Sequence, residues 1–187
     1  MEEKRKDSKR QKWLDGIGWV LYLGIIFLLT FLTIRYVGQR TRVVGESMEN
    51  TLQDGDNLIV DKISYHLHDP ERFDIIVFPY KYAADTYYIK RIIGLPGETV
   101  QITEAGDILI NGEELVESYG KEVIREPGLA AEPIRLEEGE YFVLGDNRND
   151  SSDSRSPAVG KIQREDIIGK AWLRIYPFDS IGFIRHQ

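Results

Sequence analysis

Two residues of this sequence, Ser47 and Lys90, are of types that together can catalyse the cleavage of an acyl bond. A serine hydroxyl becomes an effective nucleophile only when a neighbouring base takes its proton. Histidine is the usual base, but His66 and His68 stand in a turn-like segment and His186 is the next-to-last residue. The Gly-x-Ser-x-Gly pattern of a nucleophile turn is also missing around Ser47. The residue types therefore favour a serine nucleophile whose base is not histidine.

Lys90 can act as a base only while its amine is neutral. At an ordinary pKa near 10.4, about one lysine amine in 2,500 is neutral at pH 7, and burial can lower that pKa by up to ~3–5 units. In a strand, Lys90 would share one face with Tyr88 and Ile92. If this face is buried, the lysine is a candidate base. If it is exposed, Lys90 is an ordinary surface charge, and periodicity alone favours this second reading.

An uncharged run from Gly16 to Ile34 precedes the serine. As a helix of 19 residues, this run would be roughly 28 Å long, close to the ~30 Å hydrocarbon thickness of a bilayer. A cleaved secretory signal is the main alternative, but cleavage sites need small residues and no alanine precedes Ala83. We therefore predict an uncleaved transmembrane helix, with the anchor spanning residues 16–38.

Charge is distributed unevenly along the chain, whose net charge is −7. Residues 1–12 hold six basic and three acidic side chains, whereas the chain from Tyr36 onward holds 27 acidic and 17 basic ones. The basic end predicts a cytoplasmic segment at residues 1–15 and an extracytoplasmic domain at residues 39–187, in a single-pass protein of the cell membrane. The acidic domain argues against nucleic acid as a partner.

The segments after the apolar run are rich in β-branched residues and separated by turn residues, which predicts a mostly β domain. We expect residues 104–140 to form a variable excursion from this domain. The predicted strands are Asn57–Ser64, Asp74–Phe78, Thr86–Ile93, Thr99–Thr103, Asp107–Ile110, Tyr141–Leu144 and Ile167–Ile175.

Four sequence blocks, taken together, resemble those of bacterial type I signal peptidases. They occur in the same order and at similar spacings, and the likeness covers the anchor and nearly all of residues 40–176. The blocks are Gly45-Glu46-Ser47-Met48 with Thr51-Leu52, Asp74 to Phe78, Tyr88 to Glu98, and Gly145 to Arg155.

The resemblance implies a fold of antiparallel sheets of the signal-peptidase type and a role for each matched residue. Ser47 would be the nucleophile of a serine endopeptidase, and Lys90 the general base and then the general acid. Ser151 would hydrogen-bond and orient the lysine amine, with Asp153 and Arg155 as a supporting ion pair. No cofactor is needed for this chemistry, and no metal site is expected.

The resemblance also implies the substrates: secreted preproteins with small residues at the first and third positions before the cut, presented beside the lipid bilayer. The peptide would lie extended beside residues 41–46 and 86–89 as an added strand. Apolar walls would restrict the size of its side chains. By position, the substrate-binding residues would be Val43, Met48, Leu52, Tyr88 and Ile89.

Two positions depart from the family pattern. Gly45 stands where some relatives supply a serine hydroxyl to the oxyanion, and Asn50 stands where proline is usual. These departures keep open a non-catalytic, membrane-anchored factor for surface-protein or pilus assembly. A self-cleaving repressor is a third reading, although the chain lacks a recognisable DNA-binding segment.

Overall fold

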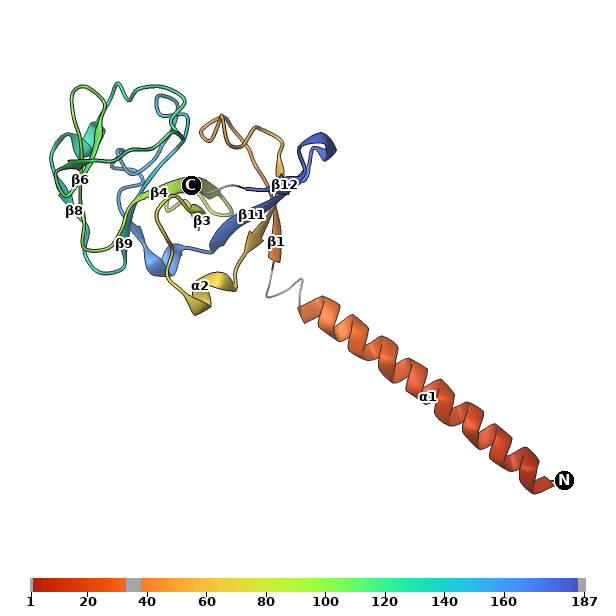
Figure 1. The fold of residues 1–187 in the computed structure, drawn as a ribbon. Coiled ribbons are helices and arrows are strands. Elements are labelled where there is room, and N and C mark those ends of the chain that lie inside the picture. The colour runs from red at the N-terminus through yellow and green to blue at the C-terminus, as the bar shows by residue number, and fades with distance from the viewer. Residues whose placement is uncertain (1, 33–37, 185–187) are drawn as a thin grey trace. The chain divides into compact units, whose positions relative to one another are not determined.

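The computed structural model describes residues 2–32 and 38–184. It divides into two compact units, residues 1–38 and 39–187, each of which is considered by itself. The first consists of the helix α1 (Glu2–Leu32), 31 residues long (Figure 1). The predicted spanning helix is not found among the described residues, where no helix has both the length and the apolarity needed to cross a membrane. Residues 33–37 of the predicted anchor lie outside the described residues.

The second unit is built on an eight-stranded sheet. Its strands follow the order β1-β2-β11-β3-β4-β9-β10, and β12 pairs with β11. The pairs β11 with β2, β3 and β12, β4 with β3 and β9, and β10 with β9 are antiparallel. The strands are β1 (Gly38–Arg42), β2 (Asn57–Asp61), β3 (Ile75–Pro79), β4 (Tyr87–Gly94), β9 (Glu140–Leu144), β10 (Ile162–Gln163), β11 (Gly169–Tyr176) and β12 (Gly182–Phe183).

A four-stranded antiparallel sheet in the order β7-β6-β5-β8 packs beside the large one. In Figure 1, β6 and β8 lie on the side of the domain opposite β12. Short helical segments complete the domain. The strands are β5 (Thr99–Ile102), β6 (Ile108–Ile110), β7 (Glu113–Glu114) and β8 (Ile134–Arg135); the helical segments are α2 (Ser64–Leu67), η2 (Gly128–Ala131), η3 (Arg164–Asp166) and η4 (Phe178–Ser180).

Strand β4 lies between β3 and β9 and is buried on both faces from Ile89 to its end. Its side chains enter three different hydrophobic clusters: Ile89 the first, Ile93 the second and Ile92 the third. Lys90 therefore lies on a buried strand, because β4 has apolar side chains packed above and below it. The structure thus contradicts the exposed position that periodicity alone favoured for Lys90.

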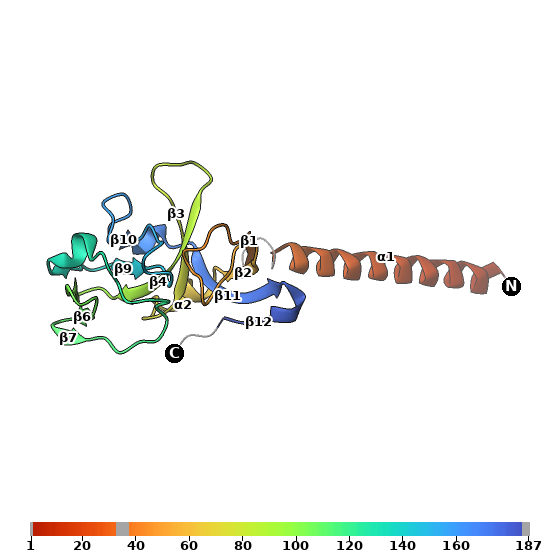
Figure 2. The same ribbon diagram turned by 90° about the horizontal axis from the view of Figure 1, so that it is seen from above.

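The mostly antiparallel β fold predicted from the sequence is confirmed, and each predicted strand overlaps a strand of the structure. The predicted strand Asn57–Ser64 is too long, because β2 ends at Asp61. The Asp61 carboxylate accepts hydrogen bonds from the N–H groups of Ile63 and Ser64, and the chain turns there into α2. Residues 104–140 supply β6, β7 and β8 to the small sheet, and they also include η2. The connection between β3 and β4 projects from the domain as a long loop (Figure 2).

Candidate active site

Ser47 lies on a tight turn that follows β1. Gly45 has a φ of 92°, a left-handed conformation that favours glycine, and its N–H donates to Asp54 Oδ1 over 2.9 Å. Glu49 N–H then donates to Glu46 O over 3.0 Å, which closes the turn around the serine. The backbone thus presents Ser47 at the end of an extended segment.

The backbone conformation of Asn50 explains why this position is not proline, as it usually is in the family. Its φ is 83°, a left-handed value that proline cannot adopt because its ring fixes φ near −65°. Asparagine tolerates this conformation better than most residues. The turn after the nucleophile therefore has a backbone conformation that asparagine can adopt and proline cannot.

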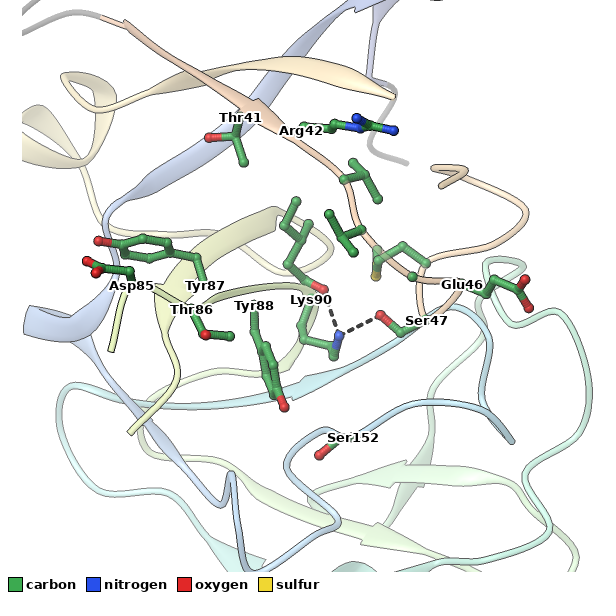
Figure 3. Close-up of a pocket in the computed structure, with 15 residues that line it drawn as sticks. Thr41, Arg42, Glu46, Ser47, Asp85, Thr86, Tyr87, Tyr88, Lys90 and Ser152 are labelled. Carbon is green, nitrogen blue, oxygen red and sulfur yellow. Dashed lines mark hydrogen bonds between the residues drawn. The ribbon is translucent and has the colours of Figure 1, made fainter. Parts of the chain in front are cut away.

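Lys90 meets Ser47 across the site. Its Nζ lies 2.7 Å from Ser47 Oγ and 2.9 Å from Ile89 O (Figure 3). Only 3% of Lys90 is exposed, and its Nζ lies 5.1 Å from the centroid of the Tyr88 ring. The sequence-predicted pair is therefore in direct hydrogen-bonding contact, although its members are 43 positions apart in the sequence.

Burial sets the protonation state of this lysine. Loss of hydration lowers the pKa of Lys90 to about 8, and the negative charges of Asp153 and Asp146 limit the decrease. At pH 7 about one amine in ten is then neutral. A neutral amine can accept the Ser47 Oγ–H hydrogen bond and take the proton.

The dyad lies in a cleft of about 420 Å³. One wall comes from residues 41–48 and the other from residues 85–90, with Ser152 at one side (Figure 3). Of the predicted substrate-binding residues, Val43, Met48, Tyr88 and Ile89 line this cleft. Leu52 is not among its lining residues; it is fully buried behind the cleft in the same cluster as Val43, Met48 and Ile89.

The loop after β9 contributes a buried ion pair near the dyad. Asp153 and Arg155 form a buried ion pair, with Arg155 Nη2 2.8 Å from Asp153 Oδ2. The same carboxylate oxygen accepts the N–H of Gly145 over 3.1 Å. The predicted hydrogen bond from Ser151 to the lysine amine is not present, because Ser151 Oγ is buried without a partner among the described residues.

A second buried ion pair flanks the dyad and was not singled out by the sequence analysis. Arg91 follows the lysine on β4 and donates to both carboxylate oxygens of Asp146, over 2.8 and 2.6 Å. Arg91 Cζ lies 3.5 Å from the centroid of the Tyr119 ring. The sequence feature that could have indicated this ion pair is that both charged residues lie inside the matched blocks. Alternation on β4 placed Arg91 on the opposite face from Lys90 and gave no partner for it.

A buried amine in contact with a serine hydroxyl in a cleft has the chemistry of a peptide hydrolase. Comparison with known proteins gives the class. Residues 16–176 match the family model for signal peptidase, peptidase S26. The chain belongs to this family, and it is a peptidase.

Two relatives agree with the family match. A signal peptidase I of Leptolyngbya laminosa is 39% identical, over 95% of this chain and 85% of the relative. A probable signal peptidase I-2 of Synechocystis sp. is 35% identical, over 97% of this chain and 82% of the relative. A crystal structure of a signal peptidase I from Enterococcus faecalis is 35% identical, covers 55% of this chain and 97% of that one, and has a TM-score of 0.44.

Proposed function

We propose that Ser47 is the nucleophile and Lys90 the general base with which this signal peptidase removes signal peptides from secreted preproteins. The observation that carries the proposal is the 2.7 Å contact between Lys90 Nζ and Ser47 Oγ, made by a lysine that is 3% exposed. This contact favours a peptidase over the non-catalytic assembly factor, because binding alone requires neither the buried amine nor the serine.

In the first step, neutral Lys90 Nζ accepts the proton of Ser47 Oγ as the oxygen attacks the carbonyl carbon of the scissile bond. The bond that forms joins Ser47 Oγ to that carbon, and the carbonyl oxygen becomes an oxyanion. The ammonium of Lys90 then gives its proton to the leaving amine as the carbon–nitrogen bond breaks. The mature protein leaves with a new amino terminus, and the signal peptide stays as an ester on Ser47.

In the second step, water hydrolyses the ester. Lys90 Nζ, neutral again, takes a proton from the water, whose oxygen bonds to the ester carbon, and Ser47 Oγ leaves with the returned proton. The signal peptide departs as a carboxylic acid, which loses its remaining proton to the solvent, and the dyad regains its initial state. One amine thus serves both steps, as its pKa of about 8 allows.

We propose that the substrate binds as an added strand between residues 41–46 and 86–89. The pairing of β4 with β9 begins at Arg91, so the amino-terminal half of β4 has the cleft on that side. Backbone pairing along this edge would hold an extended peptide. Apolar walls at Val43, Met48 and Ile89 would then select small side chains at the first and third positions before the cut.

Membrane anchoring is also a proposal. It is supported by the uncharged run from Gly16 to Ile34, which extends beyond the end of α1, and by the exposed apolar side chains of α1 from Ile17 to Phe31. The basic residues before this run favour a cytoplasmic amino terminus and an extracytoplasmic domain. Cleavage would then occur close to the bilayer, since Ser47 follows the run by 13 residues.

The test is cleavage of a purified preprotein in detergent by the intact chain, by Ser47→Ala and by Lys90→Ala, with the new amino terminus sequenced. Both variants are expected to lose activity on the order of 10³-fold or more, because neither half of the dyad works alone. Ser64→Ala and Lys161→Ala are matched controls outside the cleft and should cleave like the parent chain. Full activity of Lys90→Ala would refute the assignment of the base.

A further inference from the structure

Asn147 joins the loop after β9 to the turn that carries the nucleophile. Its backbone N–H donates to Ser47 O over 3.1 Å, and its side-chain Nδ2 donates to Glu46 O over 3.2 Å. The side chain is 7% exposed, so these bonds are made in a buried setting. One residue thus holds two successive carbonyls, those on either side of the Ser47 Cα.

The second of these bonds fixes the direction of a different group, the N–H of Ser47. Glu46 C=O and Ser47 N–H belong to the same planar peptide, in which the two point in opposite directions when the bond is trans. Glu46 O accepts from Asn147 Nδ2 and also from Glu49 N–H over 3.0 Å. Held from two sides, this peptide cannot rotate, and Ser47 N–H is kept pointing away from Asn147.

That N–H is free to act on a substrate. Among the described residues, no acceptor is bonded to the N–H of Ser47, while its neighbours at Gly45 and Glu49 are engaged in closing the turn. Position 45 is glycine, so the residue two positions before the nucleophile offers no side-chain donor for an oxyanion. Catalysis at this site therefore depends strongly on the orientation of a backbone donor.

We propose that Asn147 is a positioning residue for the oxyanion. By bonding Glu46 O, its side chain holds the Glu46–Ser47 peptide so that Ser47 N–H is oriented toward the carbonyl oxygen as it becomes negative. A donor fixed in advance stabilises the transition state without reorganising during the reaction. This inference rests on the function proposed for Ser47 and Lys90 and adds a residue that touches neither the substrate nor the lysine.

The experiment compares Asn147→Ala with the parent chain in the preprotein cleavage assay, with kcat and KM measured separately across pH. Removal of one oxyanion donor costs about 10²–10³-fold in kcat, and loosening such a donor should cost less, about tenfold. We expect kcat to fall by about that factor, with KM unchanged. The midpoint of the pH profile should also stay in place, because the environment of Lys90 is not altered.

Asn149→Ala is the matched control. The same amide in the same loop donates instead to Glu122 Oε2 and Val123 O, each over 3.0 Å, and it should leave kcat unchanged. A normal kcat for Asn147→Ala, a loss confined to KM, or a displaced pH midpoint would each overturn the proposal. If Asn147→Ala does not fold, as judged by its thermal unfolding, the same criteria apply to Asn147→Ser, whose shorter side chain cannot bridge to Glu46 O. Ser47→Ala, measured in parallel, distinguishes failure of the proposed dyad from failure of the proposed role of Asn147. If Ser47→Ala still cleaves, the dyad assignment is wrong, regardless of the result for Asn147→Ala.

Discussion

The side chain of Lys90 sets the pH range in which the proposed dyad can act. Its pKa is lowered to about 8 by burial, so the neutral form increases with pH up to that value. We expect kcat/KM to rise about tenfold per pH unit below pH 8 and to level off above it, because kcat/KM reports the free enzyme. The measurement is preprotein cleavage from pH 5.5 to pH 9.5.

One variant makes this pH prediction specific to the lysine. Asp153 and Asp146 raise the pKa of Lys90 against the effect of burial. Removing the charge with the larger effect, with Asp153→Asn, should therefore move the midpoint to lower pH. A profile that is flat across the range, or a midpoint that Asp153→Asn moves upward, would contradict the role of Lys90 as the titrating base.

The same burial should cost the protein stability. The folded-state pKa of Lys90 lies below the ordinary value of 10.5, so between about pH 8 and 10.5 the unfolded chain binds more protons than the folded one. Stability of the parent chain therefore rises with pH through this window, and the full cost is present below it. Replacing the amine by an apolar side chain of similar length, in Lys90→Met, should stabilise the protein at pH 7 by up to about 3 kcal/mol.

Urea unfolding of the intact chain in detergent, at pH 7 and at pH 10, measures this difference. The advantage of Lys90→Met should be largest at pH 7 and smaller at pH 10. Ser47→Ala is the control, because it removes the contact but leaves the buried amine in place and should keep the pH dependence of the parent chain. Equal stability of Lys90→Met and the parent at both pH values would show that the amine is not desolvated.

At the scale of elements, the end of β9 is packed directly against the nucleophile turn. A Cβ added at Gly145 would lie 2.5 Å from Ser47 O and 2.2 Å from Ser151 Oγ, both too close for any side chain. Gly145→Ala must therefore displace the turn that holds Ser47. Because a shift of about 1 Å at a reacting group can cost 10²-fold, we expect kcat/KM to fall about a hundredfold.

Gly182→Ala is the comparison for this substitution. Gly182 lies in β12, and nothing is within 4 Å of a Cβ placed there, so the change should leave cleavage unaltered. Activity is measured with the preprotein assay, and folding with far-ultraviolet circular dichroism. Wild-type activity in Gly145→Ala would mean that the loop after β9 moves without carrying the serine with it.

The strands could be predicted from the sequence because β-branched runs and turn residues are local signals. What could not be predicted was which faces are buried. The burial of Lys90 depends on β3 and β9 lying on either side of β4, and on clusters supplied by distant segments. The loop from Gly145 to Arg155 has the composition of a solvated loop, yet Asp153 is 1% exposed because Arg155 and Gly145 satisfy its carboxylate.

Only some of the site residues lie where their positions in the matched blocks led us to expect them. Ser47 and Lys90 meet as expected, whereas Leu52 lies behind the cleft and Ser151 Oγ lacks its predicted bond among the described residues. Asn147 stood in the matched block, but its bonds to two carbonyls of the nucleophile turn follow from tertiary packing alone. Motif spacing can place a residue near a site without giving the direction of its side chain.

At the scale of the whole molecule, the chain joins a basic amino-terminal segment to an acidic β domain. The family match, residues 16–176, extends across both units. In the proposed function each unit has its own role: the apolar run holds the enzyme at the membrane, and the β domain contains the active site and selects the substrate. Placement and chemistry should therefore be separable by mutation.

The separation can be tested with charges inside the apolar run. A basic residue at the centre of a spanning helix costs about 2.5–3.5 kcal/mol on insertion scales, so Ile25→Arg combined with Leu28→Arg should release the protein from membranes. The measurement is the fraction that stays with the membrane pellet after alkaline carbonate extraction. Gln11→Arg adds the same charge before the run and should remain in the pellet with the parent chain. In detergent, the double variant should still cleave a preprotein, because its β domain is unchanged. Extraction of the parent chain by carbonate would refute the anchor, and loss of cleavage in detergent would show that the helix contributes to the active site as well as to its location.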